Sequence, residues 1–332
     1  MMPVAEVAFN GRARNWMPVG ILLLLLVLVA GCARSTFVLP SGAASAWPRM
    51  LIVTAHPDDE ASVGGAVYKI THELGGVVDL ALITNGEGGY KYSLLAEPIY
   101  GLHLTDEAVG RRYLPQIRKN ELQAGGRIIG IRNYFFFDQI DHEYTKDEKV
   151  VLQQVWDLPY VTRRLHDILR NGSYDFVFCL LPTAETHGHH KAATLLALRA
   201  VAELPQSLRP VILGVSGTAE GEARLDFHGL DGYPESAVAA DAPAFSFNRL
   251  MPFGFKGQLN YQIPVSWLIA EHKSQGTMQR YIARGVTEEY YFFSQNREES
   301  RVQAARLFSK AALASAAPCH SPTSTSFFCT FL

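Results

Sequence analysis

The chain has 332 residues, of which 48% are apolar and 19% charged, with 30 Lys and Arg against 32 Asp and Glu. This composition excludes an intrinsically disordered chain. The formal net charge of −2 excludes a dedicated nucleic-acid-binding protein, whose basic face would make the charge positive. Four scattered cysteines are too few for a disulfide scaffold. These averages hide an uneven distribution, because apolar residues are concentrated near the N-terminus.

Residues 1–31 have the pattern of an export signal. Two arginines precede an uncharged apolar run at 19–30, which is too short to span a bilayer as a helix. Small residues and then Cys32 follow, and this arrangement resembles the lipobox of bacterial lipoproteins. The resemblance implies cleavage before Cys32 and a lipid on that cysteine. It places the chain, exported and lipid-anchored, in the bacterial cell envelope, at the outer membrane in a diderm. The alternative is an uncleaved signal anchor with a chance cysteine.

The chain is predicted to have four segments. They are a signal peptide at 1–31, a tether rich in small residues at 32–48, one domain at 49–316 and a flexible tail at 317–332. An exported compartment would permit a disulfide between the two tail cysteines, Cys319 and Cys329.

The domain alternates short apolar runs with helical patterns. Strands are predicted at 50–55, 77–84, 134–137, 175–181 and 211–215, and helices at 60–73, 117–129, 161–170, 191–203, 265–283 and 297–316. This alternation indicates βαβ units, and continuous apolar strands are typical of a sheet that is covered on both faces. We therefore predict a Rossmann-like α/β fold, a three-layer sandwich of a mostly parallel sheet flanked by helices. Residues 216–265 lack a clear periodicity and are predicted to be a decorated loop region with room for short strands.

Histidines and carboxylates directly follow two of the predicted strands. One group is Ala-His-Pro-Asp-Asp-Glu at 55–60, and the other is Thr-His-Gly-His-His at 186–190. In open α/β sheets, ligands bind at the carboxyl ends of the strands, and parallel neighbours bring such ends together. Two histidines and one carboxylate from separate segments form a standard set for a catalytic Zn²⁺ ion. Each motif alone also has a structural interpretation, as a helix cap or a solvated loop. Their coincidence favours a metal site.

The motif at 55–60 resembles the opening motif of the LmbE/PIG-L family of zinc-dependent N-deacetylases, which act on N-acetylglucosaminyl compounds. His187 and His190 resemble its closing His-x-x-His motif, and looser matches extend over 50–283. The resemblance implies that one zinc ion is held by His56, Asp59 and His190. It further implies that Asp58 is the general base and that His187 faces the developing oxyanion.

Two further matches concern the substrate, and one departure concerns His187. The resemblance implies that Arg118 and Asp138 help to hold the sugar. The family usually has an acidic residue directly before the last histidine, where it orients the first histidine, but this chain has His189 there. We therefore expect another carboxylate, Glu185 or Asp138, to orient His187.

The resemblance predicts a zinc-dependent deacetylase of an N-acetylated amino sugar or glycoconjugate, held at the membrane by its lipid anchor. Two other classes stay open: a zinc hydrolase of a non-sugar N-acyl compound or ester, and a non-catalytic lipoprotein that binds carbohydrate. Acetate release from a substrate panel separates the first two, and metal analysis tests the third. A nucleotide-binding Rossmann protein is disfavoured, because no Gly-x-Gly-x-x-Gly follows the first strand.

Overall fold

The computed structural model describes residues 48–219, 222–282 and 285–313. The predicted signal peptide, nearly all of the tether, the tail and the pair Cys319 and Cys329 lie outside these ranges. Within them, no helix combines the length and the apolar character that crossing a membrane requires.

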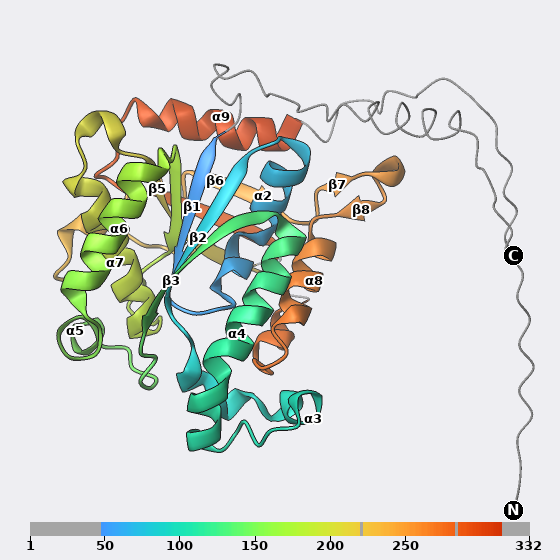
Figure 1. The fold of residues 1–332 in the computed structure, drawn as a ribbon. Helices are drawn as coiled ribbons and strands as arrows, with labels where there is room; N and C mark the ends of the chain where they lie inside the picture. Colours follow the sequence, from blue (N-terminus) through green and yellow to red (C-terminus); the bar gives the residue numbers. More distant parts are fainter. Residues whose placement is uncertain (1–47, 220–221, 283–284, 314–332) are drawn as a thin grey trace, which may run out of the picture. The chain divides into compact units, whose positions relative to one another are not determined.

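A seven-stranded sheet forms the centre of the domain (Figure 1). Its strand order is β3-β2-β1-β4-β5-β9-β6, and the first five strands are parallel to one another. β9 lies antiparallel between β5 and β6. The bounds are β1 (Arg49–Thr54), β2 (Val77–Thr84), β3 (Ile131–Gln139), β4 (Phe176–Leu180), β5 (Val211–Thr218), β6 (Phe245–Asn248) and β9 (Thr287–Phe292), with a separate hairpin of β7 (Pro252–Phe253) and β8 (Leu259–Asn260).

Helices cover both faces of the sheet, as Figure 1 shows. The helices α2, α4 and α8 pack on one face of the sheet, and α6 and α7 pack on the other. A separate hydrophobic core lies on each face. The helices are α2 (Gly64–Tyr68), α3 (Glu97–Tyr100), α4 (Glu107–Ile129), α5 (Glu148–Val150), α6 (Leu158–Gly172), α7 (Gly188–Glu203), α8 (Gln262–Glu271) and α9 (Ser300–Leu313). Short turns of 3₁₀ or π geometry include η1 (Asp59–Val63), η2 (Lys69–Glu73), η3 (Glu87–Tyr92) and η9 (Met278–Tyr281).

The central strands are mostly apolar because both of their faces are buried. In β1, Leu51 and Val53 belong to one core, while Met50 and Ile52 belong to the other. All four side chains are at most 1% exposed. The predicted three-layer α/β fold is confirmed.

Several predicted elements have different limits in the structure. The helix predicted at 60–73 is broken into η1, α2 and η2, and the one predicted at 265–283 stops at Glu271 and is followed by η9. α4 begins ten residues before its predicted start at 117, because Asp106 caps it. Pro115, a residue that ordinarily ends a helix, lies inside α4. The strand β9 was not predicted, and 216–265 contains short strands as expected.

Candidate metal centre

The two histidine motifs meet at the carboxyl edge of the sheet. His56 and Asp59 follow β1, and His190 lies in the first turn of α7, the helix after β4. Because β1 and β4 are parallel neighbours, the segments that follow them lie side by side, as the sequence predicted.

Three potential ligand atoms converge there. His56 Nδ1 lies 3.0 Å from His190 Nε2, which lies 3.1 Å from Asp59 Oδ1. The other ring nitrogen of His190 lies 3.0 Å from the hydroxyl of Thr186, so Nε2 stays directed at the group. This set of two imidazole nitrogens and one carboxylate is the one that three-ligand catalytic zinc sites use, and these residues fit a zinc ion.

The carboxylate of Asp59 is held in its charged form. Its Oδ2 accepts the backbone N–H groups of Ala55 at 3.0 Å and His56 at 2.8 Å. Burial by itself would raise the pKa of Asp59, but His190, His56 and these hydrogen bonds lower it below its usual range. A ligand carboxylate must be deprotonated, so the surroundings of Asp59 prepare it to bind a cation.

Asp58 lies beside this group in an unusual backbone conformation. Its φ of 122° is one that residues with a side chain rarely adopt. Burial raises the pKa of Asp58 to about 6, and the guanidinium of Arg118 opposes this shift only in part. A carboxyl group with this pKa is ionised at neutral pH but can still accept a proton readily, as a general base must.

Two buried residues hold the backbone of Asp58. Its N–H donates to Glu60 Oε2 at 2.9 Å, and Glu60 Oε1 lies 2.6 Å from His272 Nε2. Both Glu60 and His272 are fully buried. The sequence analysis assigned neither residue a role, since their contact joins distant parts of the chain.

Arg118 is directed at the protein rather than at solvent. It is 2% exposed and donates hydrogen bonds to the backbone carbonyls of Pro57 and Gly86. A third bond, of 3.2 Å, runs to Asp58 Oδ2. Gly86 has a positive φ and lies so close to Arg118 that a Cβ would clash with the guanidinium. Arg118 therefore positions the loop of Asp58 here, and a contact with the sugar stays a prediction.

His187 caps the start of α7. Its Nδ1 accepts the backbone N–H of His189 at 3.1 Å, so the neutral ring carries its proton on Nε2. Burial and the neighbouring His56 lower the pKa of His187 to about 2. His187 is thus a neutral hydrogen-bond donor whose ring lies 5.1 Å from that of His56, centroid to centroid.

The prediction that Glu185 or Asp138 orients His187 is wrong. The exposed Glu185 pairs with Lys146, and Asp138 is exposed and pairs with Lys119. A backbone N–H orients His187 instead. Whether Asp138 holds a substrate stays a prediction.

Asp141 was missed by the sequence analysis. It follows β3, is 4% exposed, and places Oδ1 3.1 Å from His189 Nδ1 and 3.8 Å from His56 Nε2. Its Oδ2 accepts the N–H of Gly88 at 3.1 Å. The one available signal was its place after a third parallel strand, next to β2.

A cavity of about 470 Å³ opens beside the candidate metal ligands. That volume is in the range of small-molecule sites. Polar and apolar side chains share its wall, among them Asp58, Asp59, His190, Arg249, Ile269 and Tyr281. His187 does not belong to the lining of this cavity.

Fold and site together give an α/β protein with a histidine and aspartate group that could hold a metal ion, beside a cavity of substrate size. Residues 51–201, which contain both motifs, match the family model PIG-L, described as GlcNAc-PI de-N-acetylase. These residues, just under half of the chain, match the LmbE-like deacetylase family that the sequence motifs indicated.

The individual relatives have low sequence identity to this chain. The chain is 26% identical over 176 residues to a probable N-acetyl-alpha-D-glucosaminyl L-malate deacetylase 2 from Bacillus cereus, covering 53% of this chain and 71% of that protein. It is similar to the structure of N,N'-diacetylchitobiose deacetylase from Pyrococcus horikoshii, with a TM-score of 0.36 and 22% identity, covering 57% of this chain and 61% of that one. GalB, a 4-carboxy-2-hydroxymuconate hydratase from Pseudomonas putida KT2440, gives a TM-score of 0.47 and 17% identity over 76% of this chain and 98% of that one. The chain thus spans less than two thirds of the chitobiose deacetylase.

Proposed function

We propose that this chain is a zinc-dependent hydrolase that removes the acetyl group from an N-acetylated amino sugar or glycoconjugate. The observation that carries the proposal is the convergence of His56, Asp59 and His190 beside a cavity that Asp58, Asp59 and His190 line. The matched family is described as GlcNAc-PI de-N-acetylase, and the Bacillus cereus relative is named a probable N-acetyl-alpha-D-glucosaminyl L-malate deacetylase. Both names support an acetamido sugar as the substrate.

The metal supplies the activation of water. A zinc ion held by His56, Asp59 and His190 would lower the pKa of water from 15.7 to about 7, which makes a nucleophile available at neutral pH.

Asp58 moves the protons of the reaction. Its carboxylate lines the cavity and accepts a proton from the attacking water. With its pKa raised to about 6, Asp58 can hold that proton and then donate it to the leaving amine. Burial lowers the pKa of His187, so at neutral pH its ring is not in the protonated, charged form that could donate a proton to the amine, and we assign the proton to Asp58. Arg118 donates a hydrogen bond to the Asp58 carboxylate, and Glu60 accepts the backbone N–H of Asp58, so both the side chain and the backbone of Asp58 are held in place.

His187 is the proposed donor to the oxyanion. Its Nε2–H is the free donor of the ring, because Nδ1 is occupied by the start of α7. One such donor contributes about 2.7–4 kcal/mol to transition-state stabilisation in comparable sites.

The test uses purified protein, acetate detection and elemental analysis. The wild type is expected to release acetate from at least one acetamido sugar. Asp58→Asn should keep its zinc and lose most of the activity, whereas His56→Ala should lose the metal. Wild-type turnover in Asp58→Asn would refute the base assignment. Acetate from none of the acetamido sugars, with hydrolysis of another N-acyl compound, would refute the substrate class.

The export and lipid anchoring are part of the proposal. They rest on the apolar run at 19–30 and on Cys32 directly after small residues. A lipid anchor would hold the enzyme at a membrane surface of the cell envelope.

A further inference from the structure

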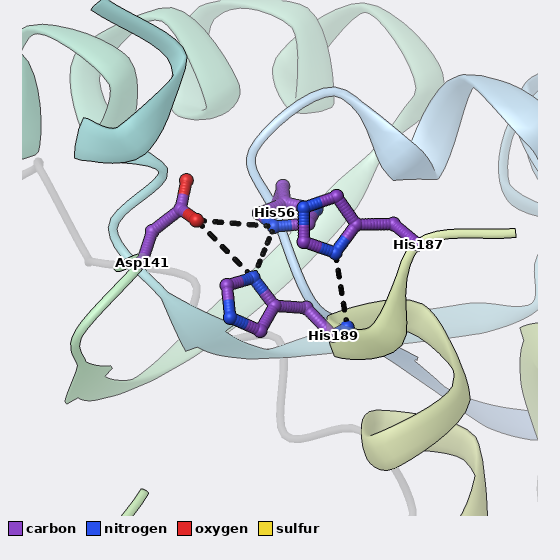
Figure 2. A group of neighbouring side chains, drawn as sticks. All are labelled: His56, Asp141, His187 and His189. Atoms are coloured by element: carbon purple, nitrogen blue, oxygen red, sulfur yellow. Dashed lines mark hydrogen bonds and ion pairs between the residues drawn. The ribbon is translucent and has the colours of Figure 1, made fainter. Parts of the chain in front are cut away.

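A second group of side chains, drawn in Figure 2, gathers around His56. Whereas His56 Nδ1 lies near His190, its Nε2 lies 3.0 Å from His189 Nδ1 and 3.8 Å from Asp141 Oδ1. The distance from His189 Nδ1 to Asp141 Oδ1 is 3.1 Å. The ring of His187 stacks on that of His189, with 4.5 Å between the centroids. One ligand atom from each of these four residues lies within 4.8 Å of the others.

Once a cation occupies His56 Nδ1 at the metal centre, the remaining proton of His56 lies on Nε2, and hydrogen bonds then do not satisfy this group well. A proton on His189 Nδ1 can be directed at His56 or at Asp141, but not at both. If His56 Nε2 also carries a proton toward Asp141, two N–H donors face each other at 3.0 Å. If His189 Nδ1 carries none, its lone pair faces the Asp141 carboxylate at 3.1 Å. His56, Asp141 and His189 are at most 8% exposed, so bulk water has little access to the group.

A cation at the centre would satisfy all three atoms together. A point equidistant from them lies about 2 Å from each, which is the length of zinc–nitrogen and zinc–oxygen bonds in proteins. His142 Nδ1 lies 3.1 Å from His189 Nε2 and can accept its proton, which leaves His189 Nδ1 as a free lone pair. His187 retains Nε2 as a fourth donor, because its Nδ1 accepts a backbone N–H.

We propose that His56, Asp141, His187 and His189 form a second site for a divalent cation of the zinc class. This second site is separate from the metal centre of His56, Asp59 and His190 and shares only His56 with it. His189, which stands where the family resemblance predicts an acid, supplies a ring nitrogen that the second site requires.

Binding of both ions requires the loss of one proton from the protein. His56 ligates through both ring nitrogens, so its imidazole releases its remaining N–H proton to solvent and becomes a bridging imidazolate. His189 and His187 bind as neutral imidazoles and Asp141 as a carboxylate. The two cations repel each other across one ring, so we expect the second ion to bind more weakly than the first. Where the proposed function holds, an ion on His187 also competes with its role at the oxyanion.

Metal stoichiometry tests the proposal. The full-length protein is stripped with chelator, dialysed against buffered Zn²⁺ and examined by elemental analysis. We expect two ions per chain for the wild type. His190→Ala should keep the second site and bind one ion, and His189→Ala should keep the metal centre and bind one. His166→Ala, a half-buried histidine on α6 outside both groups, should bind two.

A milder substitution guards against a folding defect. Asp141→Asn keeps the shape of the side chain, and with a circular dichroism spectrum like that of the wild type it should also bind one ion. One ion per wild-type chain would overturn the proposal, and so would two ions retained in both His189→Ala and Asp141→Asn. These stoichiometries are independent of acetate release, so a failure of the proposed activity leaves a different signature.

Discussion

The backbone of Asp58 is the most constrained feature of the site at the scale of single residues. Its φ of 122° is strained for a residue with a side chain, and such strain persists only where the neighbours enforce it. Glu60 does so by accepting the N–H of Asp58, and His272 fixes Glu60 in turn. The buried pair of Glu60 and His272 thus supports the proposed general base.

The pair should give folding stability a characteristic pH dependence. Burial disfavours charged His272, but the Glu60 carboxylate outweighs burial and raises the pKa of His272. A raised pKa in the folded state contributes stability that is fully present below the unfolded pKa of about 6.5 and is lost as the pH rises through the folded value. The free energy of unfolding should therefore exceed that of His272→Gln most below about pH 6.5, with the difference shrinking at higher pH.

Urea unfolding at a series of pH values measures this difference. His103→Gln, at an exposed loop position, is the control and should show no such trend. A difference between wild type and His272→Gln that grows with pH would contradict the prediction.

The motif at 55–60 predicted which residues converge, but not the residues that support them. His56, Asp58 and Asp59 are neighbours in sequence and follow a readable strand, so their place in the fold is predictable. Asp141 and His272 come from loops far along the chain. Their roles depend on which loops pack together, and no local pattern encodes that.

At the scale of elements, the antiparallel strand β9 ties the sheet to the helix beside the site. Its Glu288 is fully buried and accepts the N–H groups of Gly65 at 2.7 Å and Ala66 at 3.1 Å, at the start of α2. The same carboxylate accepts a bond from Arg249 Nε at 2.8 Å. A Cβ at Gly65 would lie 2.9 Å from Glu288 Oε1, so the close approach requires glycine.

Glu288→Leu should destabilise the protein strongly. It leaves the guanidinium of Arg249 buried without its partner, which costs about 3–5 kcal/mol in comparable pairs. Urea unfolding measures the change. The double variant Glu288→Leu with Arg249→Leu should recover part of the loss, since it removes both charges. Equal stability of Glu288→Leu and wild type would show that the pair contributes nothing.

Periodicity predicted the parallel strands well and the irregular elements poorly. The strand predicted at 77–84 matches β2 residue for residue, because a strand that is buried on both faces is a largely apolar run, interrupted here by Asp79. β9 was missed because its sequence, Thr-Glu-Glu-Tyr-Tyr-Phe, places two charges in a buried strand, and only tertiary partners make them acceptable. Pro115 normally marks a helix boundary, yet α4 continues through it.

At the scale of the whole molecule, the proposed lipid anchor makes a direct prediction. In a bacterial host with lipoprotein processing, the wild type should incorporate a fatty-acid label and partition into detergent, since the acyl chains would be attached to Cys32. Cys32→Ala should lose the label. Cys179→Ala is the matched control and should keep it, because Cys179 is buried in β4. An unlabelled wild type would leave the uncleaved signal anchor as the better interpretation of the N-terminus.

Metal binding should stabilise the entire domain. The ligands join two elements, because His56 and Asp59 follow β1 and His190 lies on α7, and an unfolded chain does not hold them together. A free ion at a thousandfold excess over its Kd adds about 4 kcal/mol. For a domain of this size, each kcal/mol of unfolding free energy shifts the Tm by about 2–4 °C. Removing the ion with a chelator should therefore lower the Tm by roughly 8–16 °C.

Readdition of Zn²⁺ should restore the Tm. His56→Ala removes the residue common to both ion sites, so its Tm should be the same with and without chelator. If chelator removed the zinc, as elemental analysis would show, and left the wild-type Tm unchanged, the ion could not bridge β1 and α7 in the folded state. In that case the His56, Asp59 and His190 group would be preformed by packing alone, and the metal would contribute chemistry without contributing to the fold.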